Sequence, residues 1–552
     1  MKKIVVILVI VAAIIIAPFI TGKIIEKQFE NKVALVNSKL EKVFHQKDLI
    51  KLEYHSGWFS SSAKTTVGDV VMNHHITHGP YCTFGVAQID SAFKISEKAE
   101  KELATLFDGK KPYSITTKLG FSGTTHLNIQ SPAFGEKELP NNPKVKIVWQ
   151  GLEFSSDITK NTVSSTFSLP KFVFKEGNGT LSIENIKSQG KGDRFLDNEL
   201  NLVLSKNFKM DSDASIGKIT FDLLNESQPV NIQINNITTQ IKTNNNNYTS
   251  NFAIENIMGK ADVYSFSTNS ININSDAVDP FWILRSNLKE ADWSSKIVAS
   301  AKNIKFNNPE EAIQVALDYH QEQQSMDNDK KIGYRELYRA SNINIQAANY
   351  DNFINNSELS YQINGLPKEQ LSILLANYID FIKHSFISNF NKGFDKYSTD
   401  DTYAIMMQYQ SKLISSGQDL AVATLQNTPE VTADFKLQGN KGDANISFKA
   451  SLVKPDASTT NIQQLVIGAL PRINAKLSIN IAESLIDAIA LLVGLDEEQL
   501  VDLKREAKQR FPIIDNNGQY SVEVEFKDSD FHVNGVLDPT FLQKYSQEFR
   551  QF

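Results

Sequence analysis

The strongest constraint on the fold is a period of two residues that recurs through most of the chain. Segments of this kind alternate apolar with polar side chains, which is the pattern of a strand with one face buried and the other in water. Turn signals such as Asn178-Gly179 and Asn517-Gly518 separate them and favour antiparallel pairing. This predicts an α+β fold that is mainly β and contains a long antiparallel sheet. The clearest segments are 145–158, 179–189, 230–243, 269–275, 358–365, 433–439 and 519–526.

Helical patterns interrupt the strands at long intervals. Residues 371, 374, 375, 378, 382 and 386 are all apolar or aromatic at helical spacing, and 485, 489, 492 and 493 repeat the pattern. We expect these helices, which lie mainly in the C-terminal half, to cover an apolar face of the sheet. The predicted helices are 96–107, 309–324, 367–390 and 478–511.

The N-terminus carries an uncharged run from Ile4 to Ile20 that follows Met1-Lys2-Lys3. Its length is at the short end of the roughly 17 to 25 residues that span a bilayer and exceeds the roughly 7 to 15 of a signal-peptide core. No small-x-small cleavage site follows it, so we expect an uncleaved single-pass anchor, although cleavage remains the alternative. The simplest topology leaves the three-residue tail in the cytoplasm and exports the rest.

An amphipathic helix is predicted to continue from the span. Apolar residues recur in it at steps of three and four, at positions 25, 29, 33, 36, 40 and 43. Two interpretations remain open. The helix packs on its own domain, or it forms a short coiled coil in a homodimer. Either one makes this segment a stalk.

These features divide the chain into four predicted regions. Residues 1–22 are the transmembrane anchor and 23–48 the amphipathic stalk. Residues 49–325 form a β-rich region, and 326–552 form a region of sheet plus helices. The last boundary lies near the short charged segment 325–333.

Composition excludes several classes of function. The net charge of −6 gives no field that would attract nucleic acid. A single cysteine, Cys82, excludes an intrachain disulfide and any thiolate zinc site. The cluster of His74, His75 and His78 places at most two imidazoles on one face of a strand, which is too few for a metal site. Without a phosphate loop, metalloprotease or nucleophile-elbow motif, we expect no enzyme, no cofactor and no metal.

The stretch from Tyr54 to Ser62 joins the stalk to the first strands and contains Gly57, Trp58 and Phe59. Glycine frees the backbone, the two aromatic residues bring large apolar area, and the serines bond locally. We interpret it as a structural corner with Trp58 buried. An aromatic loop that grips a ligand is the alternative.

Several short motifs follow one another along the chain. They are Gly22-Lys23, Tyr54, 57–61, His78-Gly79-Pro80, Ser131-Pro132, Trp149-x-Gly151-Leu152 and 518–535. In these ordered motifs the chain resembles the YdgA-type family of bacterial envelope proteins of unknown function. One departure is Ser56, where the family pattern leads us to expect Arg. The resemblance implies an inner-membrane anchor with a periplasmic body. Looser similarity to AsmA-type proteins implies a curved sheet with an apolar groove, and neither implies known catalytic residues.

A one-sided sheet beside a membrane suits an apolar ligand, and we expect a lipid or an acyl chain bound in support of envelope maintenance. The candidate groove residues are Trp58, Phe59, Ile234 and Val524, whereas Gln233 and Glu523 should face water. The main alternative is a non-enzymatic envelope scaffold that acts as a dimer or with partner proteins. A hydrolase without a known motif is the third.

Overall fold

The computed structural model divides the chain into two compact units. The first contains residues 1–246 and 250–255, and the second contains 247–249 and 256–552. Side chains are not described for residues 2–19, 42–44, 383–392, 399–403, 405, 470, 492 and 510. The described residues are 2–44, 47–68, 70–79, 85–194, 208–224, 229–244, 247–278, 292–328, 330–347, 352–392, 399–453, 468–492 and 494–541.

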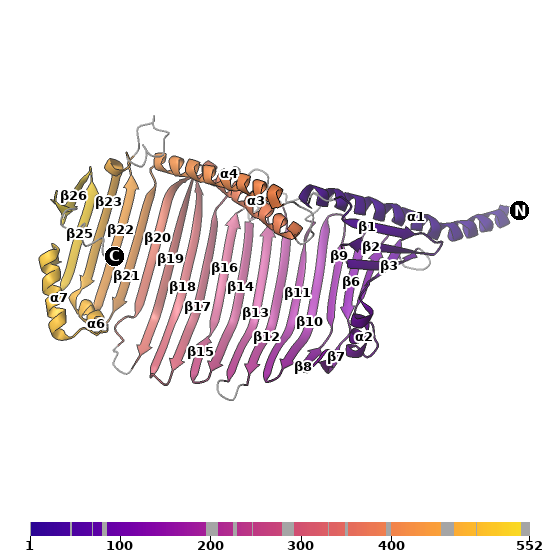
Figure 1. The fold of residues 1–552 in the computed structure, drawn as a ribbon, viewed down its shortest axis with the longest axis horizontal. Helices are drawn as coiled ribbons and strands as arrows, with labels where there is room; N and C mark the ends of the chain where they lie inside the picture. Colours follow the sequence, from indigo (N-terminus) through magenta and orange to yellow (C-terminus); the bar gives the residue numbers. More distant parts are fainter. Residues whose placement is uncertain are drawn as a thin grey trace. The chain divides into compact units, whose positions relative to one another are not determined.

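The first unit is built on an antiparallel sheet in which most neighbours in sequence pair, as Figure 1 shows. The exception is a crossing in which β6 pairs with β9, while β10 pairs with both β8 and β9. Its strands are β1 (Ile50–His55), β2 (Ser60–Val67), β3 (Val70–His78), β4 (Ala87–Phe93), β5 (Ser114–Leu119), β6 (Thr125–Ser131), β7 (Phe134–Leu139), β8 (Asn142–Trp149), β9 (Leu152–Ile158), β10 (Thr162–Glu176), β11 (Gly179–Asp193), β12 (Met210–Leu223) and β13 (Val230–Asn244).

Helix α1 (Lys2–Phe44) packs on this unit, which is the first of the two interpretations of the stalk. Ile25 is buried in a cluster with Ala63, Ile76 and Ile89, and Phe29 packs against the same cluster. The apolar side of the helix therefore packs on the sheet of its own chain at Ile25 and Phe29.

The predicted membrane span at residues 4–20 lies within α1, and all but its last side chain are outside the described residues. In the part of the chain whose side chains are described, no helix is long and apolar enough to cross a bilayer.

A short helix, α2 (Glu97–Leu106), confirms the prediction for residues 96–107. The Ser96 hydroxyl caps it by accepting from the Ala99 amide. It packs on β7 through an edge-to-face contact of Phe107 with Phe134, whose ring centroids lie 4.9 Å apart.

The second unit also contains an antiparallel meander, and its strands pair in order from β16 to β23 and then β25 to β27. The strands are β14 (Asn247–Ala261), β15 (Tyr264–Thr268), β16 (Ser270–Val278), β17 (Ser295–Asn308), β18 (Ile313–Asn328), β19 (Lys331–Gln346), β20 (Asn356–Pro367), β21 (Glu430–Gly439), β22 (Gly442–Leu452), β23 (Ile473–Ala482), β24 (Ile514–Asp515), β25 (Gln519–Lys527), β26 (Asp530–Val533) and β27 (Val536–Leu537). Residues 325–333 lie in this unit and include the turn between β18 and β19.

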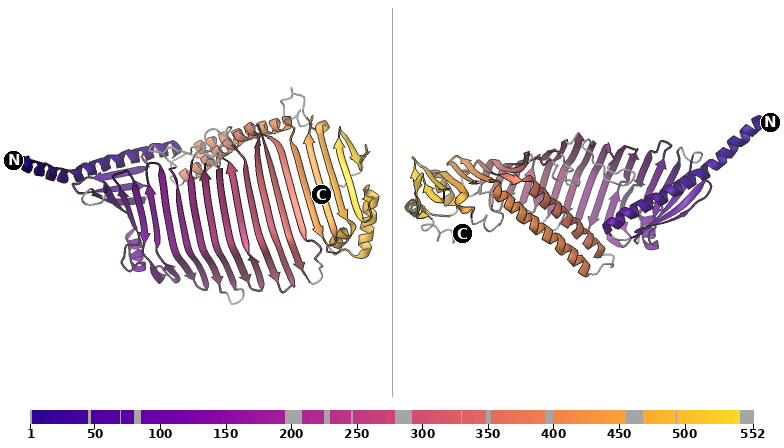
Figure 2. Two further views of the ribbon diagram at one scale, coloured as in Figure 1. Left: turned by 180° about the vertical axis from the view of Figure 1, so that it is seen from behind. Right: turned by 90° about the horizontal axis from the view of Figure 1, so that it is seen from above.

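Helices α3 (Lys368–Lys392) and α4 (Thr399–Gln426) form a hairpin between β20 and β21, and the two run side by side in Figure 2. Lys368 at the start of α3 forms an ion pair with Asp327 of β18, with 2.6 Å between Nζ and Oδ2. Both side chains are nearly buried, so this contact holds the start of the hairpin against the end of the sheet.

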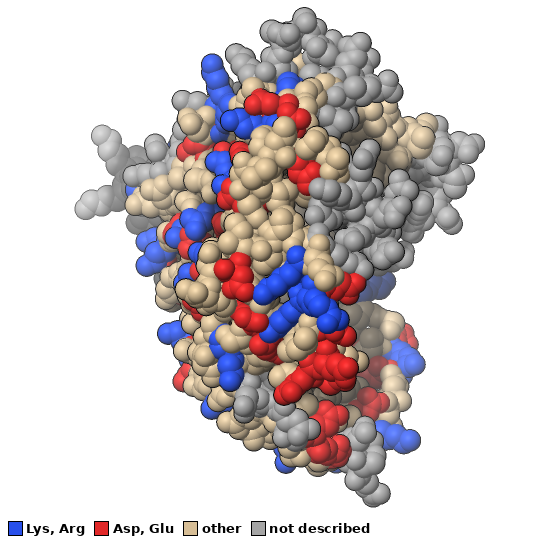
Figure 3. Space-filling view, turned by 90° about the vertical axis from the view of Figure 1, so that its left-hand side faces the viewer, with Lys and Arg blue, Asp and Glu red and all other residues tan. Residues whose placement is uncertain are grey.

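Helices α6 (Glu483–Leu492) and α7 (Glu497–Arg510) follow β23. Leu485 of α6 is buried with Phe353, Ala444 and Ala482, which places the helix on the sheet. Asp496 and Gln499 form a capping box at the start of α7. Figure 3, which views the end of the molecule that carries α7, shows basic and acidic side chains interspersed.

Two predicted helices and one predicted strand were wrong in whole or in part. Residues 309–324 are a turn followed by β18, because β17 and β19 pair with this segment along its length. Residues 478–511 divide into the end of β23 and two helices. Residues 145–158 form two strands, because Gly151 adopts a positive φ of 86° at a corner between them.

Two left-handed asparagines interrupt the alternation in the first unit. Asn185 and Asn236 have φ values of 57° and 49°, and Gly217 lies between them in the pairing of β11, β12 and β13. Asparagine and glycine tolerate this conformation, and such interruptions bend strands. In the second unit, Asp318 accepts from the backbone of Asn303 and the side chain of Asn342, both of which have a φ of 53°.

Candidate functional site

The strand register of the second unit aligns one residue from each of ten strands on a single face of the sheet. We call this face, defined by the row below and the residues two positions away along each strand, the apolar face. The row crosses ten strands and is mostly apolar at its C-terminal end. Its residues are Ser275, Ile297, Gln323, Glu336, Tyr361, Ala433, Phe448, Leu477, Val524 and Val533.

The opposite face of the same strands carries ion pairs, which confirms the one-sided pattern of the sequence. Glu523, the neighbour of Val524, pairs with Lys476, with 2.8 Å between the charged atoms. Glu358 lies on this face between Arg339 and Lys436. The two faces therefore differ in chemistry, as period-two strands require.

Large side chains on the apolar face are open to solvent. Ile297, Leu359 and Phe448 are 37%, 42% and 39% exposed, respectively. Leu359 lies two residues before Tyr361 and thus on the same face. These exposed side chains make the apolar face a candidate for contact with an apolar partner.

A buried carboxylate lies in the middle of this face. Glu336 of β19 is only 3% exposed. Its oxygens accept hydrogen bonds from the hydroxyl groups of three tyrosines and from two side-chain amides. The donors are Tyr334 (3.0 Å), Tyr338 (2.5 Å), Tyr361, Gln321 (2.9 Å) and Gln323 (2.6 Å). We call these six residues the Glu336 cluster.

The Glu336 cluster keeps its carboxyl group ionised. Burial raises the pKa of Glu336, but hydrogen bonds from Tyr338, Gln323, Tyr334 and Gln321 outweigh burial and leave that pKa below its ordinary value. Burial and the bond to Glu336 raise the pKa of Tyr334 to about 12. The bond to Glu336 and burial raise the pKa of Tyr338 to about 12 as well. At neutral pH the cluster therefore holds one negative charge.

Sequence reasoning missed this cluster, although a signal for it was present. In the segment Tyr334-Arg335-Glu336-Leu337-Tyr338, residues 334, 336 and 338 share one face of a strand. The other donors, Gln321 and Gln323 of β18 and Tyr361 of β20, can be identified only from the strand register.

Two of the predicted residues, Trp149 and Ile234, lie in one cross-strand row of the first unit with Phe172, Ile183 and Ile219. Trp149 contacts Phe172 edge to face and donates its indole hydrogen to Ser131 at 3.0 Å. Ile234 therefore lies in an apolar row of the first unit, which is separate from the apolar face defined above.

The corner after β1 brings several predicted residues together around His78, which is fully buried. The His78 ring bonds the Ser61 hydroxyl at 2.9 Å and the Trp58 carbonyl at 3.2 Å. The ring also lies against Gly22 of α1, where an added Cβ would come within 2.3 Å of it.

Other predicted corner residues support this arrangement. The Tyr54 hydroxyl donates to the Gly22 carbonyl at 3.4 Å. The amide of Gly57 donates to Ser61, and that of Gly79 donates to Val86. Pro80 and Cys82 lie outside the described residues.

The expectation that Trp58 is buried was wrong. Trp58 and Phe59 are 54% and 51% exposed, because the turn that satisfies His78 with backbone carbonyls directs both rings outward. Truncating Trp58 would therefore remove little buried area.

His74 of the predicted histidine cluster is hydrogen-bonded to two hydroxyl groups. His74 bonds Thr65 at 2.9 Å and Ser91 at 2.8 Å, and burial lowers its pKa. Among the described residues, no group of three or more His, Cys, Asp or Glu side chains could hold a metal ion.

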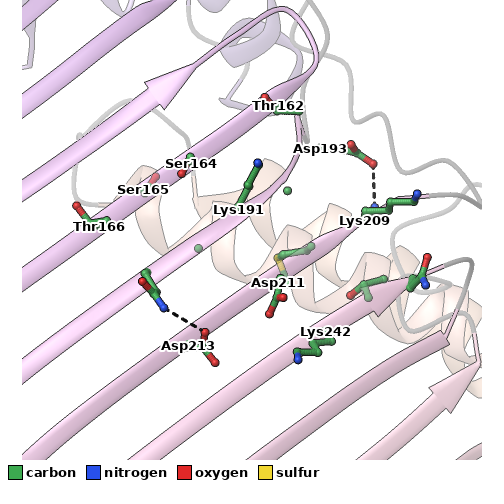
Figure 4. A pocket seen from close by; sticks show the side chains of 16 residues that line it. Thr162, Ser164, Ser165, Thr166, Lys191, Asp193, Lys209, Asp211, Asp213 and Lys242 are labelled. Carbon is green, nitrogen blue, oxygen red and sulfur yellow. Dashed lines mark hydrogen bonds between the residues drawn. The ribbon is translucent and has the colours of Figure 1, made fainter.

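A polar hollow of about 710 Å³ lies at the ends of β10 to β13, and Figure 4 shows its lining. Asp193 accepts from the Lys209 amide at 2.8 Å, and Gln189 donates to Asp213 at 3.5 Å. Lysines and aspartates alternate around the hollow, so it presents no field of one sign. The apolar face is the stronger candidate site.

The fold and this site define a class of mainly β proteins whose long antiparallel sheet has one apolar face and one charged face. The chain belongs to a bacterial protein family of unknown function, DUF945, whose model matches residues 1–277. The match includes the corner around His78 and ends before the Glu336 cluster. No curated protein and no solved structure matches the chain significantly.

Proposed function

We propose that the protein binds a lipid or another ligand with an acyl chain on the apolar face of the second unit, in support of the cell envelope. The exposure of Ile297, Leu359 and Phe448 carries this proposal. Large apolar side chains left open on an ordered sheet are costly in water, and an acyl chain laid across them would remove that cost. The expected groove of AsmA-type proteins has the same chemistry.

We further propose that residues 4–20 anchor the chain in the inner membrane and that the body lies in the periplasm. The exposed rings of Trp58 and Phe59 support this placement. The Trp58 carbonyl bonds His78, which contacts Gly22 directly after the apolar run. Exposed aromatic side chains next to the end of a membrane span suit the membrane surface, where such residues are enriched.

The ligand proposal predicts that one charge on the apolar face expels bound lipid. Phe448→Asp should reduce copurifying lipid about tenfold or more, because an unpaired charge beside acyl chains is costly. Val524→Asp should act in the same way, since Val524 shares the row. Lipid extraction from the purified full chain, followed by mass spectrometry, measures the effect.

The matched control is Asn445→Asp on the same strand. Asn445 lies opposite Lys436 on the charged face, so the new charge has a partner and bound lipid should be unchanged. If the wild-type protein carries no lipid while it functions in cells, the envelope scaffold becomes the better proposal.

The anchor proposal predicts that the protein extracted from membranes retains its first residues. N-terminal sequencing should begin within the first three residues, because no cleavage signal follows Ile20. A mature start beyond Gly22 would show that the segment is a cleaved signal and that no anchor remains.

A further inference from the structure

Glu336 differs from the carboxylates of the opposite face in the kind of group that it contacts. Glu358, Glu430 and Glu523 on that face each have a lysine or arginine within 3.2 Å. Among the described residues, the ion pairs formed by lysine, arginine and histidine do not include Glu336. The five side chains that donate hydrogen bonds to Glu336 are all neutral.

An ionised group in an apolar surface attracts a cation, because little water screens its field. The lowered pKa of Glu336 means that the charge is present at neutral pH. Since the carboxylate is buried, an approaching cation would first contact the tyrosines that surround it. Their side chains are only partly buried.

The tyrosines are suited to such a contact. Tyr334, Tyr338 and Tyr361 each give their hydroxyl hydrogen to Glu336, so each oxygen keeps lone pairs that can accept from an ammonium group. The rings of Tyr334 and Tyr361 are inclined at 44° with centroids 6.1 Å apart. Ring faces attract ammonium groups by cation–π interaction, and a nearby carboxylate adds to this attraction.

The apolar residues continue from this cluster in one direction. Beyond Tyr361 the row passes through Ala433, Phe448 and Leu477 to Val524. Strands in a sheet are about 4.8 Å apart, so the path from Tyr361 to Val524 crosses about 19 Å, which is close to the length of an acyl chain. A negative site therefore lies at one end of an apolar path.

We propose that the Glu336 cluster selects a phospholipid that carries an ammonium group in its headgroup. The ammonium group would lie on Tyr334, Tyr338 and Tyr361, and the acyl chain would follow the row toward Val524. This inference rests on the proposed function and names the class of its ligand. Lipids whose only headgroup charge is negative would be repelled by Glu336.

The test compares two ligands that share an acyl chain and a phosphate but differ in the ammonium group. The full chain, kept in an amphiphilic polymer without detergent, is titrated with lysophosphatidylethanolamine and with lysophosphatidylglycerol. Displacement of a fluorescent fatty acid reports binding. We expect the ammonium lipid to bind about tenfold more tightly.

The variant Glu336→Gln removes the charge with little change in shape. It should bring the affinity for the ammonium lipid down to that for lysophosphatidylglycerol. Glu358→Gln, on the opposite face, is the matched control and should retain the preference. A Glu336→Gln variant that keeps the wild-type preference would overturn the inference.

The wild-type comparison alone separates the two proposals, even if Glu336→Gln does not fold. Equal affinity for both lipids would overturn headgroup selection and leave the apolar site in place. No binding of either lipid would overturn the proposed function itself.

Discussion

Replacing Glu336 by leucine is expected to destabilise strands β18 to β20 by about 3 kcal/mol. The substitution removes the acceptor for five hydrogen bonds, and leucine offers none in return. Gln321 and Gln323 on β18 and Tyr361 on β20 then lose the group that joins them to β19. Buried or half-buried donors without an acceptor account for most of the loss.

Hydrogen exchange of the full chain measures this effect strand by strand. Slow amides in β18, β19 and β20 should exchange roughly a hundredfold faster, because 1.4 kcal/mol corresponds to a factor of ten. Glu358→Leu is the control on the opposite face. Its ion pairs with Arg339 and Lys436 are half-exposed and are worth about 1 kcal/mol or less. Equal effects of the two substitutions would show that the Glu336 cluster stabilises the sheet no more than the half-exposed ion pairs of Glu358 do.

Shortening Ile25 to alanine is expected to destabilise the contact of α1 with the first unit by about 2 to 5 kcal/mol. The Ile25 side chain is 1% exposed and fills the cluster that contains Ala63 and Ile76. Alanine would leave a cavity between the helix and strands β2 and β3. We expect faster hydrogen exchange in residues 22–40 of α1 and easier proteolysis of this segment.

The neighbouring position provides a matched control. Ile24 is 49% exposed, so Ile24→Ala should change the exchange of α1 little. If both substitutions release α1 equally, packing of the apolar side of the helix on the sheet does not hold it. A coiled coil between two copies would then become the better explanation of the apolar spacing.

Local patterns predicted much of the fold because they state which side of a strand meets water. Residues 230–243 and 519–526 alternate, and both are strands, β13 and β25, which end one residue later than expected. The turn at Asn178-Gly179 closes the pairing of Glu176 with Gly179 as expected. These outcomes depend on neighbours in sequence, which the pattern contains.

Residues 309–324 show where local patterns fail. Pro309, Glu310 and Glu311 have the composition of a helix start, and the residues after them allow either structure. Pairing with β17 on one side and β19 on the other provides backbone partners along the whole strand. Such tertiary pairing outweighs a weak helical preference.

The corner around His78 shows a mixed outcome. The residues from Gly57 to Phe59 form the bend between β1 and β2, as their types predict, but these types did not predict the exposure of Trp58. A fully buried imidazole takes the Trp58 carbonyl and the Ser61 hydroxyl as its partners. With both backbone carbonyls turned toward His78, the rings of Trp58 and Phe59 remain about half exposed.

The sequence by itself determined that this protein alternates between an apolar and a polar face, and that Val524 belongs to one and Glu523 to the other. Only the tertiary structure decided which residues of different strands share a row. The register depends on how the strands pair with one another, and the alternation within one strand does not specify it. That register brings Gln323, Glu336 and Tyr361 together. It also surrounds the buried Glu336 with tyrosine and glutamine donors from three strands, a combination that no pattern within a single strand contains.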